Sequence, residues 1–156
     1  KEVGSDVLRY FFIMRHMNSH LNFDLKLATE KSEENPVYYI QYANARISNI
    51  LKKAIDINVN ENVNLNSLTT DIELKIINKL INFEELIKKL LDSNEPQMLA
   101  NYLYELSALF HKYYAHNRII QENMELTKAR IVLIKAIQIV IKNGLKILGI
   151  SSPDKM

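Results

Sequence analysis

Residues 35–46 read Asn-Pro-Val-Tyr-Tyr-Ile-Gln-Tyr-Ala-Asn-Ala-Arg, and this stretch decides the fold. Asn35 is a favourable N-cap, and Pro36 suits the first position of a helix, where the missing N–H of proline costs no hydrogen bond. With about 100° between successive residues, the apolar side chains that follow fall on one stripe down to residue 53. The stripe comprises Val37, Ile40, Ile47 and Leu51, with Ala43 and Ile50 along its edge. The pattern predicts an amphipathic helix over residues 36–53.

A second stripe runs beside the apolar one and consists of Tyr39, Tyr42 and Arg46, spaced i, i+3, i+7. Tyrosines beside an apolar face usually form the rim of a core, and an arginine one turn further on is usually solvated or ion-paired. Aromatic faces next to a guanidinium are also what unpaired RNA bases use for stacking and edge recognition. Spacing alone leaves both interpretations open.

Helix signals recur along the rest of the chain. Thr70 and Glu73 form a capping box, Pro96 marks the start of a long helix, and Gly149 ends the last one. Residues 55–69 alternate asparagine with apolar residues and predict a loop. The remaining predicted helices cover about residues 6–17, 24–31, 70–80, 83–91, 95–119 and 128–148. We therefore expect an all-α helical bundle of about five to seven helices, forming one domain over residues 1–156.

The same patterns give finer expectations. Ser5 or Asp6 is predicted to cap the first helix, and Thr127 the last. Gly144, inside the last helix, predicts a close contact with another helix. Three groups of apolar residues are predicted to face the core: Val7, Leu8, Phe11 and Phe12; Leu74, Ile77 and Ile81; Leu99, Leu103, Leu106 and Phe110.

Composition limits the function classes. Among 156 residues, 47% are hydrophobic and only three are glycine and three proline, which favours a helical globular domain over a turn-rich β architecture. The chain has no cysteine, which excludes disulfides, a thiolate metal site and a thiol nucleophile and fits a reducing cytoplasm. A net charge of +2 is small, so nucleic-acid binding would need a local patch or base stacking. No apolar run approaches the roughly 18–20 residues of a membrane span, and no signal peptide is visible.

Motifs for catalysis and metal binding are missing from the sequence. It contains no P-loop, GxGxxG, HExxH or GxSxG motif. His16 and His20 have the i, i+4 spacing of a metal pair, but no third ligand is near in sequence, so we interpret both as solvated. We therefore predict no catalytic residue and no metal ligand in this chain.

Four segments in order carry a resemblance to a known family. Residues 35–46 are similar to the signature of the anticodon-binding (DALR) domain of arginyl-tRNA synthetase, a class I aminoacyl-tRNA synthetase. Residues 3–11 resemble the family's link from the catalytic domain, residues 21–28 the segment before the Asn-Pro, and residues 143–156 its C-terminus. Two departures are Asn44, where the family often has histidine, and a closing Asp-Lys-Met instead of Glu-Arg-Met. The resemblance covers essentially the whole chain.

The resemblance implies a role in protein biosynthesis. The parent enzyme ligates arginine to its tRNA using ATP with magnesium, and its catalytic domain would precede residue 1. This fragment should then be inactive, need no cofactor of its own, and work in the cytoplasm as a monomer. Its partner would be the anticodon loop of arginine tRNA, held by Tyr39, Tyr42, Arg46, Tyr114 and the terminal Met156.

Further residues follow from the same resemblance. Arg118 stands where some members carry a tryptophan, and Gln41 and Asn44 are neighbours that either hydrogen-bond a base edge or are solvated. Residues after Gly149 are expected to be ordered beside the 36–53 helix, with Met156 at the rim of the tyrosines.

Two other functions remain open on sequence grounds. The apolar stripes and the tyrosine-rich rim would also suit a helical protein-interaction module. The related domain of another class I synthetase, such as the cysteinyl enzyme, is a further alternative. Steep salt dependence of binding would separate RNA from an apolar protein groove, and a swapped anticodon would separate the two synthetases.

Overall fold

Seven α-helices form the fold in a computed structural model that describes residues 3–15, 23–30, 32–59 and 63–156. The predicted all-α class is confirmed over these residues, whereas His16 and His20 lie outside them. The helices are α1 (Ser5–Ile13), α2 (Leu25–Thr29), α3 (Pro36–Lys53), α4 (Asp71–Ile81), α5 (Phe83–Ser93), α6 (Gln97–His116) and α7 (Met124–Ile147), with a single 3-10 turn, η1, at Leu65–Ser67.

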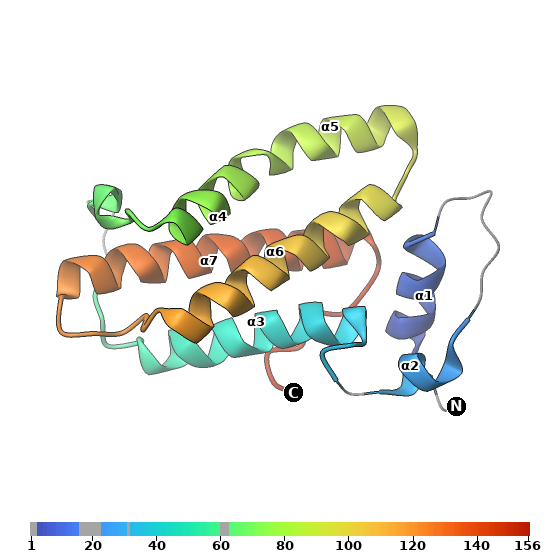
Figure 1. The fold of residues 1–156 in the computed structure, drawn as a ribbon, viewed down its shortest axis with the longest axis horizontal. Coiled ribbons are helices and arrows are strands. Elements are labelled where there is room, and N and C mark those ends of the chain that lie inside the picture. Colours follow the sequence, from blue (N-terminus) through green and yellow to red (C-terminus); the bar gives the residue numbers. More distant parts are fainter. Residues whose placement is uncertain (1–2, 16–22, 31, 60–62) are drawn as a thin grey trace.

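The centre of the bundle consists of α3, α6 and α7, each packed against the other two. Helices α4 and α5 cover the side of α6 away from α3, and α1 and α2 lie beyond the first turns of α3 (Figure 1). The predicted stripe of α6 is fully buried, with Leu99, Leu103, Leu106 and Phe110 all inaccessible. The core therefore runs the length of α6.

Helix α3 begins as the sequence predicts. The Asn35 side chain accepts hydrogen bonds from the N–H groups of Val37 at 3.1 Å and Tyr38 at 3.4 Å, and Pro36 is the first helical residue. The apolar stripe is placed slightly differently from the prediction. Ala43 is fully buried at its centre, and Leu51 is only partly buried. Contact with both α6 and α7 explains this, because the small alanine lets neighbouring helices approach α3 closely.

Glycine and the capping box behave as predicted. A Cβ added to Gly144 would lie 2.6 Å from a δ carbon of Leu103, so α6 and α7 pack closely there and a larger residue would displace the Leu103 side chain. Thr70 and Glu73 make both hydrogen bonds of the capping box at the start of α4. Gly149 has a φ of +66° just after α7, which is the left-handed conformation expected of a C′ residue.

The predicted start of the last helix was wrong by four residues. Asn123 is the N-cap and accepts from the N–H of Leu126 at 3.1 Å, so α7 begins at Met124. Thr127 is fully buried, and its hydroxyl hydrogen-bonds both the N–H and the C=O of Gln121. The hydroxyl therefore holds the α6–α7 connection instead of capping a helix. Helix α6 likewise ends at His116, before the predicted residue 119, because Asn117 is extended.

Helix α1 also differs from the prediction. Gly4 is the N-cap and no side chain caps the helix. The buried residues are Tyr10 and Phe11, whereas Leu8 and Phe12 are exposed. Tyr10 was missed because a tyrosine at the end of a bundle can be buried whole when its hydroxyl finds a partner, here the carbonyl of Ala100 at 3.1 Å.

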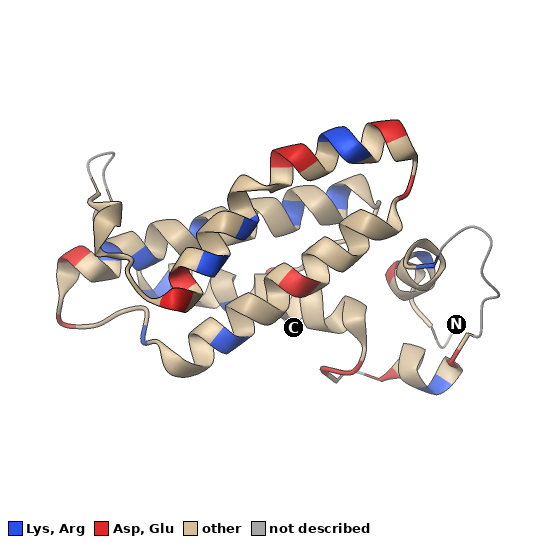
Figure 2. Ribbon diagram, turned by 45° about the horizontal axis from the view of Figure 1, so that its top comes forward, with Lys and Arg blue, Asp and Glu red and all other residues tan. Residues whose placement is uncertain are grey.

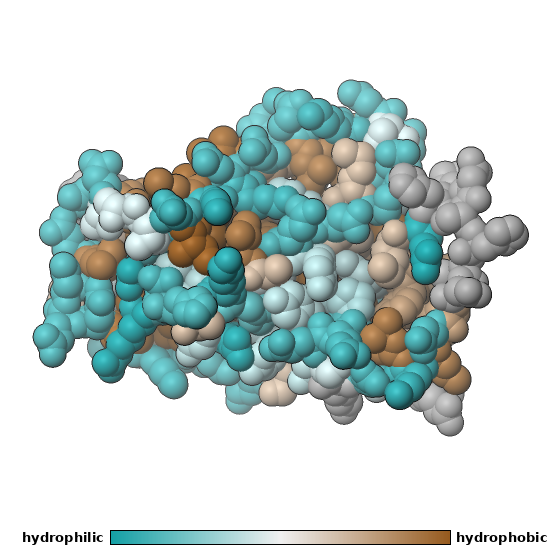
Figure 3. Space-filling model, viewed as in Figure 1, coloured by the Kyte–Doolittle hydropathy of each residue, from teal (hydrophilic) through white to brown (hydrophobic). Residues whose placement is uncertain are grey.

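The predicted inward face of α4 was right only for Ile77, which is partly buried against the core. Ile76 and Glu73 are buried, whereas Leu74 and Ile81 are exposed and border an apolar groove against α7. Figure 3 shows this apolar surface as brown atoms over α4. The helix turns its buried side to α6 and α7 at once, which brings the charged Glu73 inside, a position that periodicity alone would assign to an apolar residue.

The exposed side of α5 carries two ion pairs. Figure 2 shows acidic and basic positions alternating along it, and Glu84 pairs with Lys88 and Glu85 with Lys89 at i, i+4 spacing. Within the part of the chain that the structure describes, no helix is long and apolar enough to cross a membrane.

Candidate nucleic-acid interface

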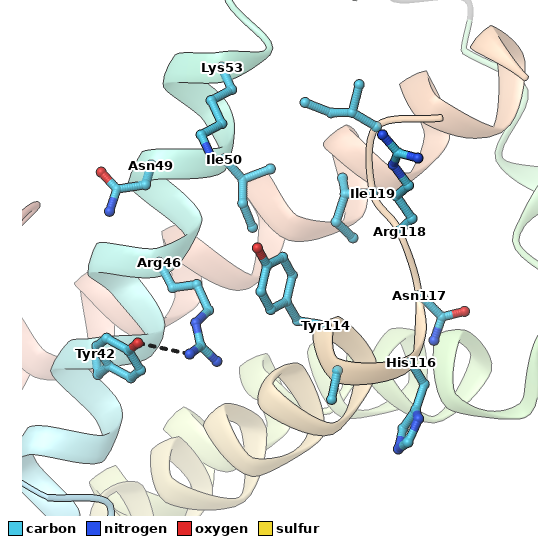
Figure 4. Close-up of a pocket in the computed structure, with 12 residues that line it drawn as sticks. Tyr42, Arg46, Asn49, Ile50, Lys53, Tyr114, His116, Asn117, Arg118 and Ile119 are labelled. Carbon is cyan, nitrogen blue, oxygen red and sulfur yellow. Dashed lines mark hydrogen bonds between the residues drawn. The ribbon is translucent and has the colours of Figure 1, made fainter. Parts of the chain in front are cut away.

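A cleft of about 900 Å³ opens where the C-terminal halves of α3 and α6 meet the connection to α7 (Figure 4). Helix α3 provides one wall, the last turn of α6 the second, and the residues after Asn117 the third. The lining residues are Tyr42, Arg46, Asn49, Ile50, Lys53, Tyr114, Ala115, His116, Asn117, Arg118, Ile119 and Ile120. The cleft therefore joins segments that are about 70 positions apart in sequence.

Arg46 lies at the centre of this site, between two phenol rings. The carbon of its guanidinium is 4.4 Å from the ring centroid of Tyr42 and 5.2 Å from that of Tyr114. One of its terminal nitrogens donates a hydrogen bond to the Tyr42 hydroxyl at 2.8 Å. Both rings attract the cation through their π faces, so the guanidinium is fixed in one orientation.

His111 of α6 also contacts Arg46. The sequence analysis did not identify this residue. Its Nδ1 lies 3.1 Å from the other terminal nitrogen of Arg46, and its Nε2 lies 3.2 Å from the carbonyl of Tyr39. Because arginine can only donate, Nδ1 must accept and Nε2–H must donate to the carbonyl, which defines a neutral imidazole. Burial lowers the pKa of His111 and the charge of Arg46 lowers it further, while the hydrogen bond to Tyr39 opposes both.

The cleft has a positive charge balance. Arg46, Lys53 and Arg118 contribute cations, and none of its twelve lining residues is acidic. Asn49 and Asn117 add amide donors and acceptors, and the exposed Tyr114 ring adds an aromatic face. Cations, aromatic faces and amides together can hold an unpaired nucleic-acid strand by its phosphates, base faces and base edges.

Four of the eight residues named from the sequence line the cleft: Tyr42, Arg46, Tyr114 and Arg118. Tyr39 lies one turn away, partly exposed, with its ring 4.5 Å from that of His111 and 5.3 Å from that of Tyr104. Burial and the nearby Tyr104 raise the pKa of Tyr39, so its hydroxyl stays protonated at neutral pH. Tyr39, Tyr42 and Arg46 thus share a partly open face of α3, as the spacing predicts.

Gln41 and Asn44 lie on another side of α3, against the C-terminal tail. Asn44 is fully buried, and its amide donates to the carbonyls of Ser152 at 3.1 Å and Pro153 at 2.7 Å. Gln41 donates to the carbonyl of Ser151 at 3.0 Å. The geometry favours structural roles for both residues over contact with a base.

The tail after Gly149 follows this side of α3, and its end lies beside that helix (Figure 1). Ser48 donates to the carboxylate of Asp154 at 2.7 Å, which fixes the tail two residues before Met156. Met156 itself is about half exposed. Its contact with RNA stays a prediction.

Other lining residues could have been found from the sequence. Asn49 and Lys53 lie seven and eleven positions after Tyr42 and so share its face of the helix. Asn117 and His111 gave no such signal, because they depend on how α6 meets α3. Among the residues described, no group of three histidine, aspartate or glutamate side chains could hold a metal ion.

Comparison with known proteins gives a consistent result. The family model for the DALR anticodon binding domain matches residues 40–156. The chain is 42% identical to an arginine–tRNA ligase of Listeria monocytogenes and 45% identical to one of Carboxydothermus hydrogenoformans, each over 100% of this chain and 29% of the relative. It thus spans about 29% of the length of these curated relatives.

Solved structures show the same fold. An arginyl-tRNA synthetase structure from Campylobacter jejuni matches 99% of this chain and 34% of its own with a TM-score of 0.88 at 30% identity. That of Thermus thermophilus matches 97% of this chain and 26% of its own with a TM-score of 0.83 at 26% identity.

Proposed function

The chain belongs to the DALR anticodon-binding domain family, and from that premise we propose that it binds the anticodon loop of arginine tRNA through the cleft around Arg46. The observation that carries the proposal is the arrangement of Arg46 between the rings of Tyr42 and Tyr114 in a cleft without acidic residues. The fixed guanidinium offers donors to a base edge or a phosphate, and the exposed ring of Tyr114 offers a face for stacking.

We further propose that this domain belongs to a longer protein that ligates arginine to its tRNA using ATP with magnesium. The name and greater length of the relatives support this. ATP and arginine would bind in a part of that protein that this chain does not span, and the domain described here would supply tRNA recognition. Such a protein would act in the cytoplasm, as a monomer.

A binding titration of this chain tests the first proposal. Arginine tRNA, cysteine tRNA and arginine tRNA with an exchanged anticodon are compared at several salt concentrations. We expect tight binding only for the arginine anticodon, with affinity falling steeply as salt rises because the cations of the cleft displace counterions. Equal affinity for all three RNAs, or an affinity that ignores salt, would contradict the proposal and favour a protein-interaction module.

A matched pair of variants locates the site. Arg46→Ala should weaken binding of arginine tRNA by about 1–3 kcal/mol, the usual loss for an arginine that contacts a base edge. Lys88→Ala removes the same charge from α5, on the other side of α6, and should leave the affinity within about twofold. Equal losses from the two variants would mean that binding follows net charge and not the cleft.

A further inference from the structure

A buried ion pair lies behind the wall of the cleft. Glu73 of α4 is fully buried, Arg130 of α7 is 7% exposed, and the Nε of Arg130 donates to the carboxylate of Glu73 at 3.0 Å. Tyr113 of α6 donates its hydroxyl to the same carboxylate oxygen at 2.9 Å. The N–H of Thr70 donates to the other oxygen at 3.0 Å. The pair therefore joins three helices.

The guanidinium of Arg130 also reaches the connection that forms the third wall of the cleft. One terminal nitrogen donates to the carbonyl of Arg118 at 2.9 Å, and the other to the side-chain oxygen of Asn117 at 3.4 Å. The amide of Asn117 in turn donates to the carbonyl of Tyr113 at 3.0 Å. The connection leaves α6 at this point in an extended conformation, so these contacts hold its first two residues.

Stability is a poor explanation for this pair. Removing two charges from water costs several kcal/mol per ion, and well-packed apolar residues in place of a buried pair are often as stable or more so. The planar fork of arginine, by contrast, fixes three acceptors at defined angles, which a lysine cannot do. Arg130 donates to three acceptors, and two of these belong to Asn117 and Arg118, which line the cleft.

We propose that Glu73 and Arg130 are positioning residues for RNA binding: they fix Asn117 and Arg118 so that the exposed Arg118 side chain faces the anticodon loop. This inference rests on the proposed function and adds two residues from outside the cleft to the recognition machinery. Glu73 orients Arg130, and Arg130 acts on the RNA only through the connection that it holds.

Two variants separate positioning from stability. Arg130→Lys keeps a positive charge beside Glu73 but lacks the fork that reaches Arg118 and Asn117, and it should lower the affinity for arginine tRNA by about five- to tenfold. Tyr10→Phe on α1 likewise removes one hydrogen bond of a buried side chain, to the carbonyl of Ala100, without touching Glu73, Arg130 or the connection, and it should leave the affinity within about twofold. Urea unfolding of both proteins measures how much each variant destabilises the fold.

A double-mutant cycle with Arg118→Ala tests whether the effect passes through Arg118. In the Arg130→Lys background, Arg118→Ala should cost much less than the roughly tenfold expected in the wild type, because the side chain is already misplaced. Additive losses, equal losses from Arg130→Lys and Tyr10→Phe, or no loss from Arg118→Ala alone would each overturn the inference.

Failure of the inference is distinguishable from failure of the proposed function. If the wild-type chain binds arginine tRNA selectively and Arg130→Lys binds it with the same affinity, only the inference is overturned. If the wild-type chain shows no selective binding, both the inference and the proposed function are overturned. If circular dichroism shows that Arg130→Lys is unfolded, the paired replacement Glu73→Leu with Arg130→Met takes its place in the cycle, because it leaves no buried charge unpaired. The expected loss and the expected coupling to Arg118 are the same.

Discussion

Two stripes on α3 have the same spacing and opposite surroundings. Tyr39, Tyr42 and Arg46 are spaced i, i+3, i+7, and so are Gln41, Asn44 and Ser48. The first set, the open stripe, is partly exposed beside an open cleft. The second set, the closed stripe, is covered by residues 151–154, which lie more than 100 positions later in the chain. Periodicity therefore tells which residues share a face, but not whether a distant segment closes that face.

The closed stripe is held by a continuous set of hydrogen bonds. The Asn44 amide donates to two tail carbonyls, and its oxygen accepts from Gln138 of α7 at 3.2 Å. Gln138 also donates to Ser48 at 2.7 Å. Asp154 accepts from Lys142 at 2.9 Å, in addition to its bond with Ser48. The open stripe instead concentrates its contacts on Arg46, so the two stripes should respond to different measurements.

The largest expected effect is on the closed stripe. Asn44→Ala should lower the free energy of unfolding by about 2–3 kcal/mol, because two partly buried tail carbonyls lose their donor and Gln138 loses one of its two acceptors. Urea unfolding followed by circular dichroism measures the change. Asn49→Ala, an exposed asparagine of the same helix, is the control and should cost less than about 0.5 kcal/mol. Equal stabilities of the two variants would break the distinction between the stripes.

The second effect is on the open stripe and concerns binding. Tyr42→Ala should weaken the affinity for arginine tRNA by about 1–3 kcal/mol, the usual cost of losing a base–aromatic stack. The change also removes one of the two rings that hold the guanidinium of Arg46. The fold should lose less stability than from removal of a core leucine. Fluorescence titration measures the affinity.

A matched aromatic truncation controls for the loss of ring area. Phe12→Ala on α1 removes an exposed ring at the opposite end of the bundle (Figure 1) and should leave RNA binding unchanged. The contrary result, equal losses from both variants, would show that the α3 stripe is not the binding face.

The sequence predicts the open stripe well because its signals are local. The cap at Asn35 and the stripe of tyrosines with Arg46 follow from periodicity and capping within α3, and the class of fold follows from the same kinds of signal along the rest of the chain. The sequence alone could not predict Glu73 inside the core, because a charged residue is buried only if Arg130 and Tyr113 meet it from 57 and 40 positions away. His111 was missed for the same reason.

The order of the C-terminal tail is predicted by the family resemblance and not by the local sequence. Nothing local in residues 151–156 requires order, and a chain end usually frays. The structure nevertheless places residues 151–154 against α3, with Gly149 at +66° turning the chain back from α7. Gln41, Asn44 and Ser48 hold the tail there, and no motif indicates their role as its partners.

The third prediction joins the two stripes. A chain that ends at Ser152 loses the bonds of Pro153 and Asp154 to Asn44 and Ser48, and we expect it to be about 1–2 kcal/mol less stable. If the tail also brings Met156 to the RNA, arginine tRNA should bind more weakly to this chain and to Met156→Ala. Unchanged affinity in both proteins, with the helical fold intact, would rule out a role for Met156 and confine recognition to the cleft.

The smallest effect uses pH, to which the contact of His111 with Arg46 of the open stripe should respond between pH 7.5 and 5.5. Burial and Arg46 lower the pKa of His111 below its usual 6.5, so the unfolded chain takes up a proton that the folded chain refuses, and stability falls as the pH drops through this range. On the closed stripe, the hydrogen bonds from Lys142 and Ser48 hold the pKa of Asp154 below 3.8, so that carboxylate stays charged throughout.

His111→Gln isolates this contribution, because the amide can still accept from Arg46 and donate to the carbonyl of Tyr39 but does not titrate. The melting temperature of the variant should fall less between pH 7.5 and 5.5 than that of the wild type, since the two proteins differ only at position 111. Parallel curves would mean that His111 is protonated as readily in the folded chain as in the unfolded one, and therefore that its Nδ1 does not hold Arg46 as an acceptor. Orientation of the guanidinium would then be left to Tyr42 of α3 and Tyr114 of α6, the two tyrosines that lie against it.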